Sequence, residues 1–294
     1  MKKLLMHFLP STATSSKRRY EDLLMKSSKL ETDVARTFRE STKKTNIHGE
    51  SNLLFMMCMA NSVKDVHAAS FSKYRESNLG KTITIVGAGP SLKYYTPDKE
   101  SLHIGVNGTY RKMNLDYLFL QDFEGESDTF NLDEIKELNC HKFVGRYIKR
   151  VLSELHMMAP VYIEKYIGAE SYFVYDYFGR YIDYLPRPEL EYFPLIDNSS
   201  SIFAAMQFAL YTHPQKIRIV GCDCSNLGGQ HFDGSGGAPL QLDTVAKNWI
   251  RMKEYMDVYY PDVIVESVNP IGLRGLFEDV YSEEFIRDNP LTEE

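Results

Sequence analysis

Short apolar runs rich in β-branched residues recur from Lys81 onward and alternate with segments of helical periodicity. Runs of this kind, bounded by glycine or by polar residues, are typical of buried parallel strands. The pattern predicts strands at residues 82–86, 103–107, 116–122, 142–144, 172–175, 216–221 and 263–265. Apolar residues at helical spacing predict helices over residues 132–138, 200–211 and 240–259. This alternation favours an α/β domain with a doubly wound, mostly parallel sheet.

The first 80 residues follow a different pattern. Apolar residues at helical spacing predict one helix over about residues 20–38 and a second over about residues 52–70. The sequence Asn-Leu-Gly at residues 78–80 then breaks the pattern. We therefore expect an N-terminal helical extension over residues 1–80 and a main domain over residues 81–285.

Charge is unevenly distributed along the chain. Residues 1–81 carry 15 Lys and Arg against 8 Asp and Glu, and the remainder carries 19 against 32. An acidic main domain does not suit an enzyme that tracks nucleic-acid phosphates, so we expect no nucleic-acid partner. The basic clusters at residues 17–19 and 43–44 suit either a solvated helix face or a peripheral contact with an anionic membrane surface.

Neither a membrane span nor a disulfide scaffold is indicated by the sequence. It has no run of the roughly 18 apolar residues that a membrane helix needs, and its first residues lack a clean signal-peptide cleavage site. The four cysteines show no paired spacing, which favours a reducing compartment. Cys222 and Cys224 are too close in sequence for a usual zinc site. We expect a cytoplasmic protein that requires no metal.

The residues that follow the predicted strands are the candidates for ligand binding, because ligands of open parallel sheets bind beyond the carboxyl ends of the strands. The first strand ends in a G-x-G turn, whose glycines let a ligand approach the backbone and whose following helix start offers N–H groups to a phosphate. A purely structural tight turn is the alternative. Candidate substrate-binding residues at the first three strand ends are Gly87, Ala88, Gly89, Pro90, Ser91, Asn107, Gln121 and Asp122.

The G-x-G turn departs from the dinucleotide-binding fingerprint. Leu92 stands where that fingerprint has its third glycine, and the second strand ends in Asn107 rather than in an acid that would bind a ribose diol. Both departures argue against classifying the chain as a dehydrogenase or as a standard methyltransferase.

The strand predicted at residues 216–221 is followed by Asp223, Ser225 and a loop over residues 226–237 that contains five glycines. A loop of this length inside a compact domain is often functional. Its histidine, His231, is a candidate general base, and a solvent-exposed loop histidine is the alternative.

A run of small polar residues precedes the helix predicted at residues 200–211. Such a run caps the helix, and its hydroxyls also suit an anion or nucleotide at the helix N-terminus. The candidate binding residues in this run are Asn198, Ser199 and Ser200.

These motifs follow one another in an order that resembles a known family. The order is GAGPSL at 87–92, Asn107, Gln121-Asp122, NSSSIFAAMQFAL at 198–210 and KIRIVGCDCS at 216–225, with SVNPIGLRGLF at 267–277 near the end. It resembles the bacterial sialyltransferases of lipo-oligosaccharide biosynthesis. It also resembles the related family of motility-accessory-factor flagellin glycosyltransferases and archaeal 6-hydroxymethylpterin pyrophosphokinases. The resemblance extends over roughly residues 81–280.

The resemblance implies a single Rossmann-like domain, a variant of the GT-A type, with a lid or acceptor insertion over about residues 146–197. It implies a metal-independent, inverting transfer of a sialic-acid-like sugar from a CMP-activated or other nucleotide sugar to a surface-glycan or protein acceptor. The loop at 87–92 would approach the CMP phosphate and ribose, and Asn107 and Gln121 would contact the donor. Asn198 and Ser199 would bind the nucleotide. His231 would be the general base.

Two positions depart from the family pattern. The sialyltransferases carry Asn where this chain has Ala88, and they carry phosphate-binding tyrosines where this chain has Ser225. The leaving phosphate would then need other donors, such as the tyrosines of residues 172–184, Arg180 or Arg274.

Two other functions stay open on the sequence. An ATP-dependent pyrophosphokinase of the hydroxymethylpterin type needs Mg²⁺ beside the phosphates, held by carboxylates such as Asp122, Glu124, Asp223 and Asp233. A non-catalytic nucleotide-sugar-binding protein is the other, because a fold does not determine a function.

Tyrosine is over-represented, with 20 residues against a single tryptophan. Eight of the tyrosines lie between Tyr162 and Tyr192. A tyrosine offers an apolar face and a hydroxyl to a sugar ring, so this segment is a candidate acceptor surface, and a packed aromatic core is the alternative.

Overall fold

The structure is a computed structural model of the 294-residue chain. The chain divides into two compact units, Met1–Met56 and Met57–Glu294. All residues that the structure describes belong to the second unit, so the helix expected over 20–38 and the basic clusters lie outside them. The described residues are 61, 63–121, 131–148, 162–175, 186–196, 200–224, 232 and 242–289.

Within the described residues, nine strands form one sheet in which every neighbouring pair is parallel. The order across the sheet is β6-β5-β4-β3-β2-β1-β7-β8-β9. The strands are β1 (Thr82–Val86), β2 (Ser101–Val106), β3 (Tyr117–Leu120), β4 (His141–Ile148), β5 (Glu170–Tyr175), β6 (Leu195–Ile196), β7 (Lys216–Val220), β8 (Ile264–Val268) and β9 (Glu278–Val280).

The helical elements interleave with the strands, because parallel neighbours need a crossover connection. They are a helix over residues 63–71, the 3₁₀ helices η2 (Ser72–Tyr74), η3 (Pro90–Tyr94) and η4 (Asn107–Arg111), and the α-helices α2 (Leu132–Glu137), α4 (Ile202–Tyr211), α5 (Leu242–Tyr259) and α6 (Glu283–Asp288).

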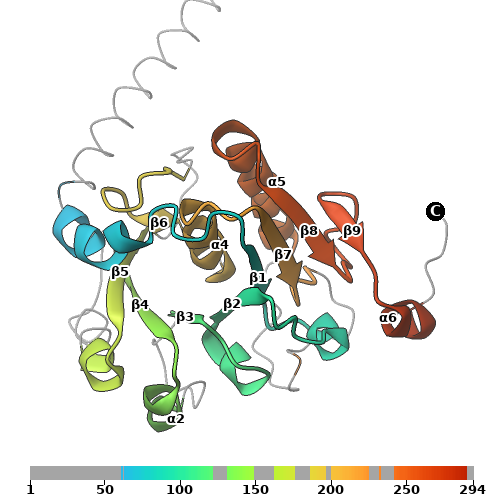
Figure 1. Ribbon diagram of the computed structural model, residues 1–294, viewed down its shortest axis with the longest axis horizontal. Coiled ribbons are helices and arrows are strands. Elements are labelled where there is room, and N and C mark those ends of the chain that lie inside the picture. The colour runs from blue at the N-terminus through green and yellow to red at the C-terminus, as the bar shows by residue number, and fades with distance from the viewer. Residues whose placement is uncertain are drawn as a thin grey trace, which may run out of the picture. The chain divides into compact units, whose positions relative to one another are not determined.

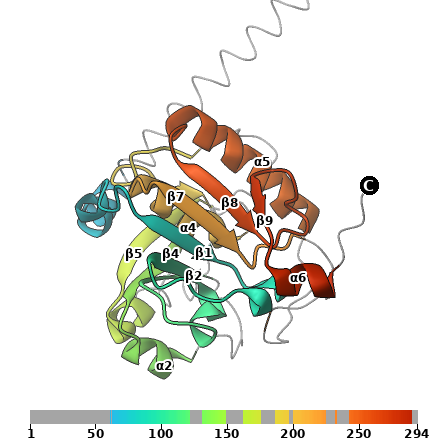
Figure 2. The ribbon, with the colours of Figure 1, turned by 45° about the vertical axis from the view of Figure 1, so that its right-hand side comes forward.

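The chain reverses its direction across the sheet once, between β1 and β7. From β1 it moves strand by strand to β6, and α4 then returns it to β7 on the other side of β1. Figure 2 shows β1, β7, β8 and β9 side by side. Val86, the last residue of β1, is in register with Gly105 of β2 and with Val220 of β7. This point of reversal is where open parallel sheets bind their ligands.

Helices cover both faces of the sheet (Figure 1), and the side chains of each strand alternate between the two cores that result. Phe119 of β3 lies in one core with α4 and α5 residues, whereas its neighbours Leu118 and Leu120 lie in the other with Ile135 of α2. All residues of α4 are buried, because α4 packs on the sheet and is also contacted by Phe71 and Tyr74 and by α5. The ring centroids of Phe203 in α4 and Trp249 in α5 are 5.0 Å apart.

The predicted strands and the three predicted helices of the main domain are confirmed, with ends shifted by a few residues. The sequence did not predict β6, β9 or α6, which have only two, three and six residues. Residues 63–80 belonged to the expected extension, yet Phe71 and Tyr74 lie in the main hydrophobic core. Among the described residues, no helix is long and apolar enough to cross a membrane.

Candidate functional site

The loops that follow β1 and β7 touch each other at the point of strand reversal. The N–H of Gly87 donates to the carbonyl of Val220 at 2.8 Å, and the N–H of Gly89 donates to that of Gly221 at 2.7 Å. A Cβ built on Gly87 would lie 2.5 Å from the Gly221 oxygen, and one on Gly221 would lie 2.4 Å from the Gly87 oxygen. The two glycines are therefore needed for the approach of one loop to the other.

A buried carboxylate ties the two loops together. The N–H of Ser91 donates to Oδ2 of Asp223 at 2.8 Å, and the Ser91 hydroxyl donates to Oδ1. Asp223 is 5 % exposed; burial raises the pKa of its carboxyl group, and the two bonds from Ser91 oppose that shift. A Cβ on Gly89 would lie 2.6 Å from Oδ2, so this glycine makes room for the carboxylate. Both predicted binding residues, Ser91 and Asp223, are thus partners of each other.

The expected N–H cradle for a phosphate is not formed as the sequence predicted. The β1 strand is followed by the five-residue 3₁₀ helix η3 rather than by a longer helix. Pro90 has no N–H group, the N–H of Leu92 donates to Gly89, and the N–H groups of Gly89 and Ser91 are bonded within the protein. At most the N–H of Ala88 is left in this loop for a bound anion.

Polar side chains that follow β2 and β3, that precede α4 and that lie in β5 meet at the carboxyl edge of the sheet. The side-chain oxygen of Asn107 accepts the N–H of Gln121 at 3.0 Å, and its Nδ2 donates to the Ser201 hydroxyl at 3.2 Å. Nε2 of Gln121 donates to the Tyr172 hydroxyl of β5 at 2.8 Å. We call Asn107, Gln121, Tyr172 and Ser201 the amide cluster. The structure joins Asn107 and Gln121, two of the residues that the sequence placed at the ends of predicted strands.

The Gln121 side chain is fully buried, and its Oε1 has no hydrogen-bond partner among the described residues. Gly145 of β4 is the reason it fits, because a Cβ there would lie 2.8 Å from Cγ of Gln121. A buried amide atom without a partner costs about 1–3 kcal/mol. Such an atom at the carboxyl edge of the sheet is a place where a ligand group or a water would gain a hydrogen bond.

Several candidates from the sequence lie outside the described residues: Asp122, Glu124, Arg180, Asn198, Ser199, Ser225, His231 and Asp233. Ser200 is described and partly exposed just before α4. Phe232 is the described neighbour of His231. Its N–H donates to the carbonyl of Ala88 at 2.9 Å, and its side chain packs against the core that contains Val86 and Leu92.

The thiols and carboxylates near the end of β7 form no metal centre within the described part of the chain. Burial raises the pKa of Cys224 to about 12 and that of Cys222 well above its ordinary value, so both thiols are protonated at neutral pH. Of the four carboxylates proposed for Mg²⁺, Asp223 alone is described, and it is bonded to Ser91.

The tyrosines expected to form one surface are divided by the structure. Tyr172 is fully buried in the core, whereas Tyr162 and Tyr192 are exposed. Tyr162 and Tyr166 stack with ring centroids 6.0 Å apart. The side chain of Tyr175, together with Tyr177, Tyr181 and Tyr184, lies outside the described residues.

Sequence reasoning did not assign Tyr172 and Ser201 individually to the site. Ser201 belongs to the predicted hydroxyl run, but Tyr172 carries no local signal, since it lies inside a strand. Arg274, one of the expected phosphate donors, is exposed on the segment after β8. That segment reaches the site through Gly272, whose N–H donates to the carbonyl of Asp223 at 2.7 Å.

Comparison with known proteins leaves the family of the chain undetermined. It matches no protein-family model, and no curated protein is significantly similar to it. The resemblance to the sialyltransferases and their relatives therefore rests on the order of its motifs alone.

Proposed function

We propose that the protein is a Rossmann-like glycosyltransferase that binds a nucleotide sugar at the carboxyl edge of the sheet, beside the amide cluster. The parallel sheet reverses between β1 and β7, where ligands of such sheets bind. The order of motifs that resembles the sialyltransferases runs through the same strand ends. A CMP-activated sugar is accordingly the first donor to test.

The observation that carries the proposal is Oε1 of the fully buried Gln121 in the amide cluster, which has no hydrogen-bond partner in the part of the chain that the structure describes. Amides and hydroxyls both donate and accept hydrogen bonds, as the hydroxyls of a ribose or a sugar require. A donor hydroxyl placed at this atom would satisfy it. The site would then prefer ligands that carry this hydroxyl, because a ligand without it would leave Oε1 of Gln121 unpaired.

The proposed reaction inverts the anomeric carbon. An acceptor hydroxyl oxygen forms a bond to that carbon, and the bond from the carbon to the phosphate oxygen breaks, with its electron pair staying on the phosphate. His231 takes the proton of the attacking hydroxyl as general base. The serine hydroxyls at the start of α4 and the guanidinium of Arg274 are the proposed donors to the departing phosphate.

The bonds between Ser91 and Asp223 have a positioning role in this proposal. They hold the loop after β1 against the end of β7, next to the amide cluster. Because the loop after β1 is already held in place, binding of the donor would cost less conformational entropy.

A thermal-shift panel of CMP, UDP, GDP, ATP and their sugars, with and without EDTA, tests the proposal. A ligand at 100 times its Kd stabilises the native state by about 2.7 kcal/mol. We expect one nucleotide and its sugar to raise the Tm equally well with EDTA. Stabilisation by ATP only in the presence of Mg²⁺ would favour the pyrophosphokinase instead, and no stabilisation by any nucleotide would refute donor binding.

Gln121→Met tests the amide itself, because it keeps the length of the side chain and removes its hydrogen bonds. We expect it to weaken nucleotide-sugar binding about tenfold, the effect of one lost hydrogen bond. Gln215→Met, at an exposed residue before β7, is the matched control. Equal affinities of the two variants would remove Gln121 from the binding site.

A further inference from the structure

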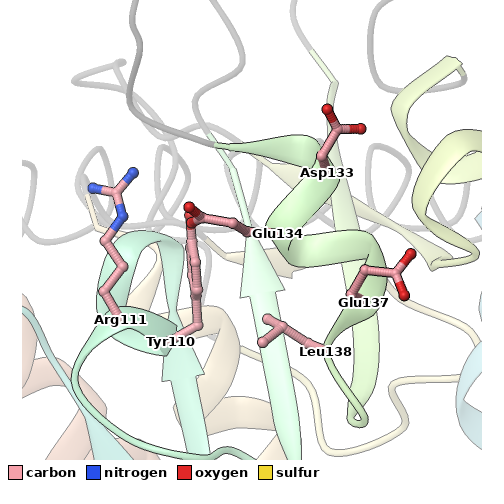
Figure 3. Close-up of a pocket in the computed structure, with 6 residues that line it drawn as sticks. All are labelled: Tyr110, Arg111, Asp133, Glu134, Glu137 and Leu138. Atoms are coloured by element: carbon pink, nitrogen blue, oxygen red, sulfur yellow. The ribbon is translucent and has the colours of Figure 1, made fainter.

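A cavity of about 770 Å³ opens between η4 and α2, outside the amide cluster. Its volume is within the range of small-molecule sites. Figure 3 shows Tyr110 and Arg111 rising from η4 and Glu134 extending from α2 towards them. Its lining residues are Tyr110, Arg111, Asp133, Glu134, Glu137 and Leu138.

The cavity carries one guanidinium and three carboxylates, a net charge of −2. The Asp133 carboxylate accepts the Tyr166 hydroxyl, and Tyr166 stacks on the exposed Tyr162. The side chains of Glu134 and Glu137 form no hydrogen bond or ion pair with the described residues. Two acceptors that are bonded to none of the described residues therefore stand in a cavity with aromatic rings at its side.

The geometry of these groups indicates the kind of ligand. The three carboxylates do not converge, and within the described residues they form no group that could hold a metal ion. A linear polyamine offers donors only, so it could pair with the carboxylates but could accept no hydrogen bond from the guanidinium of Arg111. A saccharide offers spaced hydroxyls that donate to carboxylates and accept from a guanidinium, and its apolar faces pack on tyrosine rings.

We propose that this cavity is a saccharide-binding subsite that takes neutral or amine-bearing sugars and rejects anionic ones. The net charge of its lining is the reason for this selectivity, since an anionic sugar would meet like charge. One 3₁₀ helix connects the cavity with the amide cluster, because η4 begins at Asn107 and ends at Arg111. At about 2.0 Å of rise per residue, these two residues are separated by about 8 Å along the axis.

This separation makes the cavity the subsite for the acceptor, a reading that rests on the proposed function. A donor bound at Asn107 and Gln121 and a saccharide bound at Arg111 and Glu134 would lie next to each other along η4. The transfer would then join a nucleotide-bound sugar to a non-anionic glycan acceptor.

Calorimetric titration of the full chain with three tetrasaccharides tests the inference. The probes are the tetramers of glucosamine with protonated amines, of N-acetylglucosamine and of galacturonate. We expect the glucosamine tetramer to bind most tightly, the neutral tetramer more weakly and the galacturonate tetramer not at all. Glu134→Gln should weaken binding of the glucosamine tetramer about fivefold, the effect of one partly screened charged hydrogen bond.

Glu284→Gln is the matched control, because Glu284 is also exposed in the first turn of a short helix, α6, and does not line the cavity. Equal affinities of the two variants would overturn the inference. So would tight binding of the galacturonate tetramer or binding of none of the three.

The nucleotide panel reports separately on the proposed function. Saccharide binding without nucleotide stabilisation would support the subsite and refute the transferase. Nucleotide stabilisation without saccharide binding would refute the subsite alone.

Discussion

His67 provides a test of how the helix of residues 63–71 is held on the sheet. It lies in the helix of residues 63–71 and is fully buried. The N–H of Phe173 in β5 donates to Nε2 of His67 at 2.7 Å, and Nδ1 lies 2.7 Å from the carbonyl of Leu190. Because Nε2 accepts, the proton is on Nδ1 and is donated to Leu190. Both ring nitrogens are thus used by the neutral form.

Burial lowers the pKa of the His67 imidazole from 6.5 to about 4, against the opposing effect of the backbone bonds at Leu190 and Phe193. The unfolded chain therefore binds a proton at a higher pH than the native state does. The contribution of His67 to stability is fully present above pH 6.5 and is lost as the pH falls towards 4. At about 1.4 kcal/mol per pH unit, the full loss is about 3 kcal/mol, and about 2 kcal/mol of it is reached at pH 5.

Urea unfolding of the wild type and of His67→Gln at pH 7 and at pH 5 measures this effect. Glutamine offers one acceptor and one donor but does not titrate in this range. We expect the wild type to lose about 2 kcal/mol more than the variant between the two pH values. An equal loss of unfolding free energy in both proteins would show that the pKa of His67 is not lowered in the native state and would refute the reasoning.

Two further predictions concern the contact between the loops after β1 and β7. Gly221→Ala should destabilise the protein by about 3 kcal/mol or more, because φ is +64° and the new Cβ would lie 2.4 Å from the Gly87 oxygen. Gly275→Ala, with φ +71° and open space around it, should show only the conformational cost of about 1–2 kcal/mol, and equal losses in urea unfolding would argue against the steric contact. Asp223→Ala should cost about 2 kcal/mol by leaving the buried donors of Ser91 unpaired, whereas Asp223→Asn should cost less than about 1 kcal/mol, since its amide can still bond Ser91. Identical unfolding free energies for these two variants would show that the carboxylate does not hold the loop.

The amide cluster illustrates which parts of the site could be predicted from sequence. Asn107 and Gln121 each follow a short apolar run, and adjacent parallel strands end at the same edge of a sheet. Their positions at strand ends could be predicted, whereas the hydrogen bond of 3.0 Å between them depends on β2 and β3 being neighbours in the sheet. The partners Tyr172 and Ser201 come from β5 and the start of α4, and no local pattern relates them to Gln121 or Asn107.

The sequence was sufficient to predict the alternation of strands and helices, because periodicity and β-branched composition act over a few neighbouring residues. It also determined which polar residues stand at the ends of the longer strands. The shortest strands, β6 and β9, carry too few residues for such a pattern.

The roles of the glycines and of the carboxylate after these strands depend on contacts between loops that are distant in sequence. Ser91 and Asp223 are 132 positions apart in sequence, and their bond exists because β1 and β7 are neighbours in the sheet. Because β1 and β7 are neighbours, Gly87 and Gly221 lie at the contact between the two loops. N–H groups that we expected to bind a phosphate are hydrogen-bonded within the protein at this contact. Strand order is set by packing of the whole chain, so the partners of a loop residue become known only when the sheet is assembled.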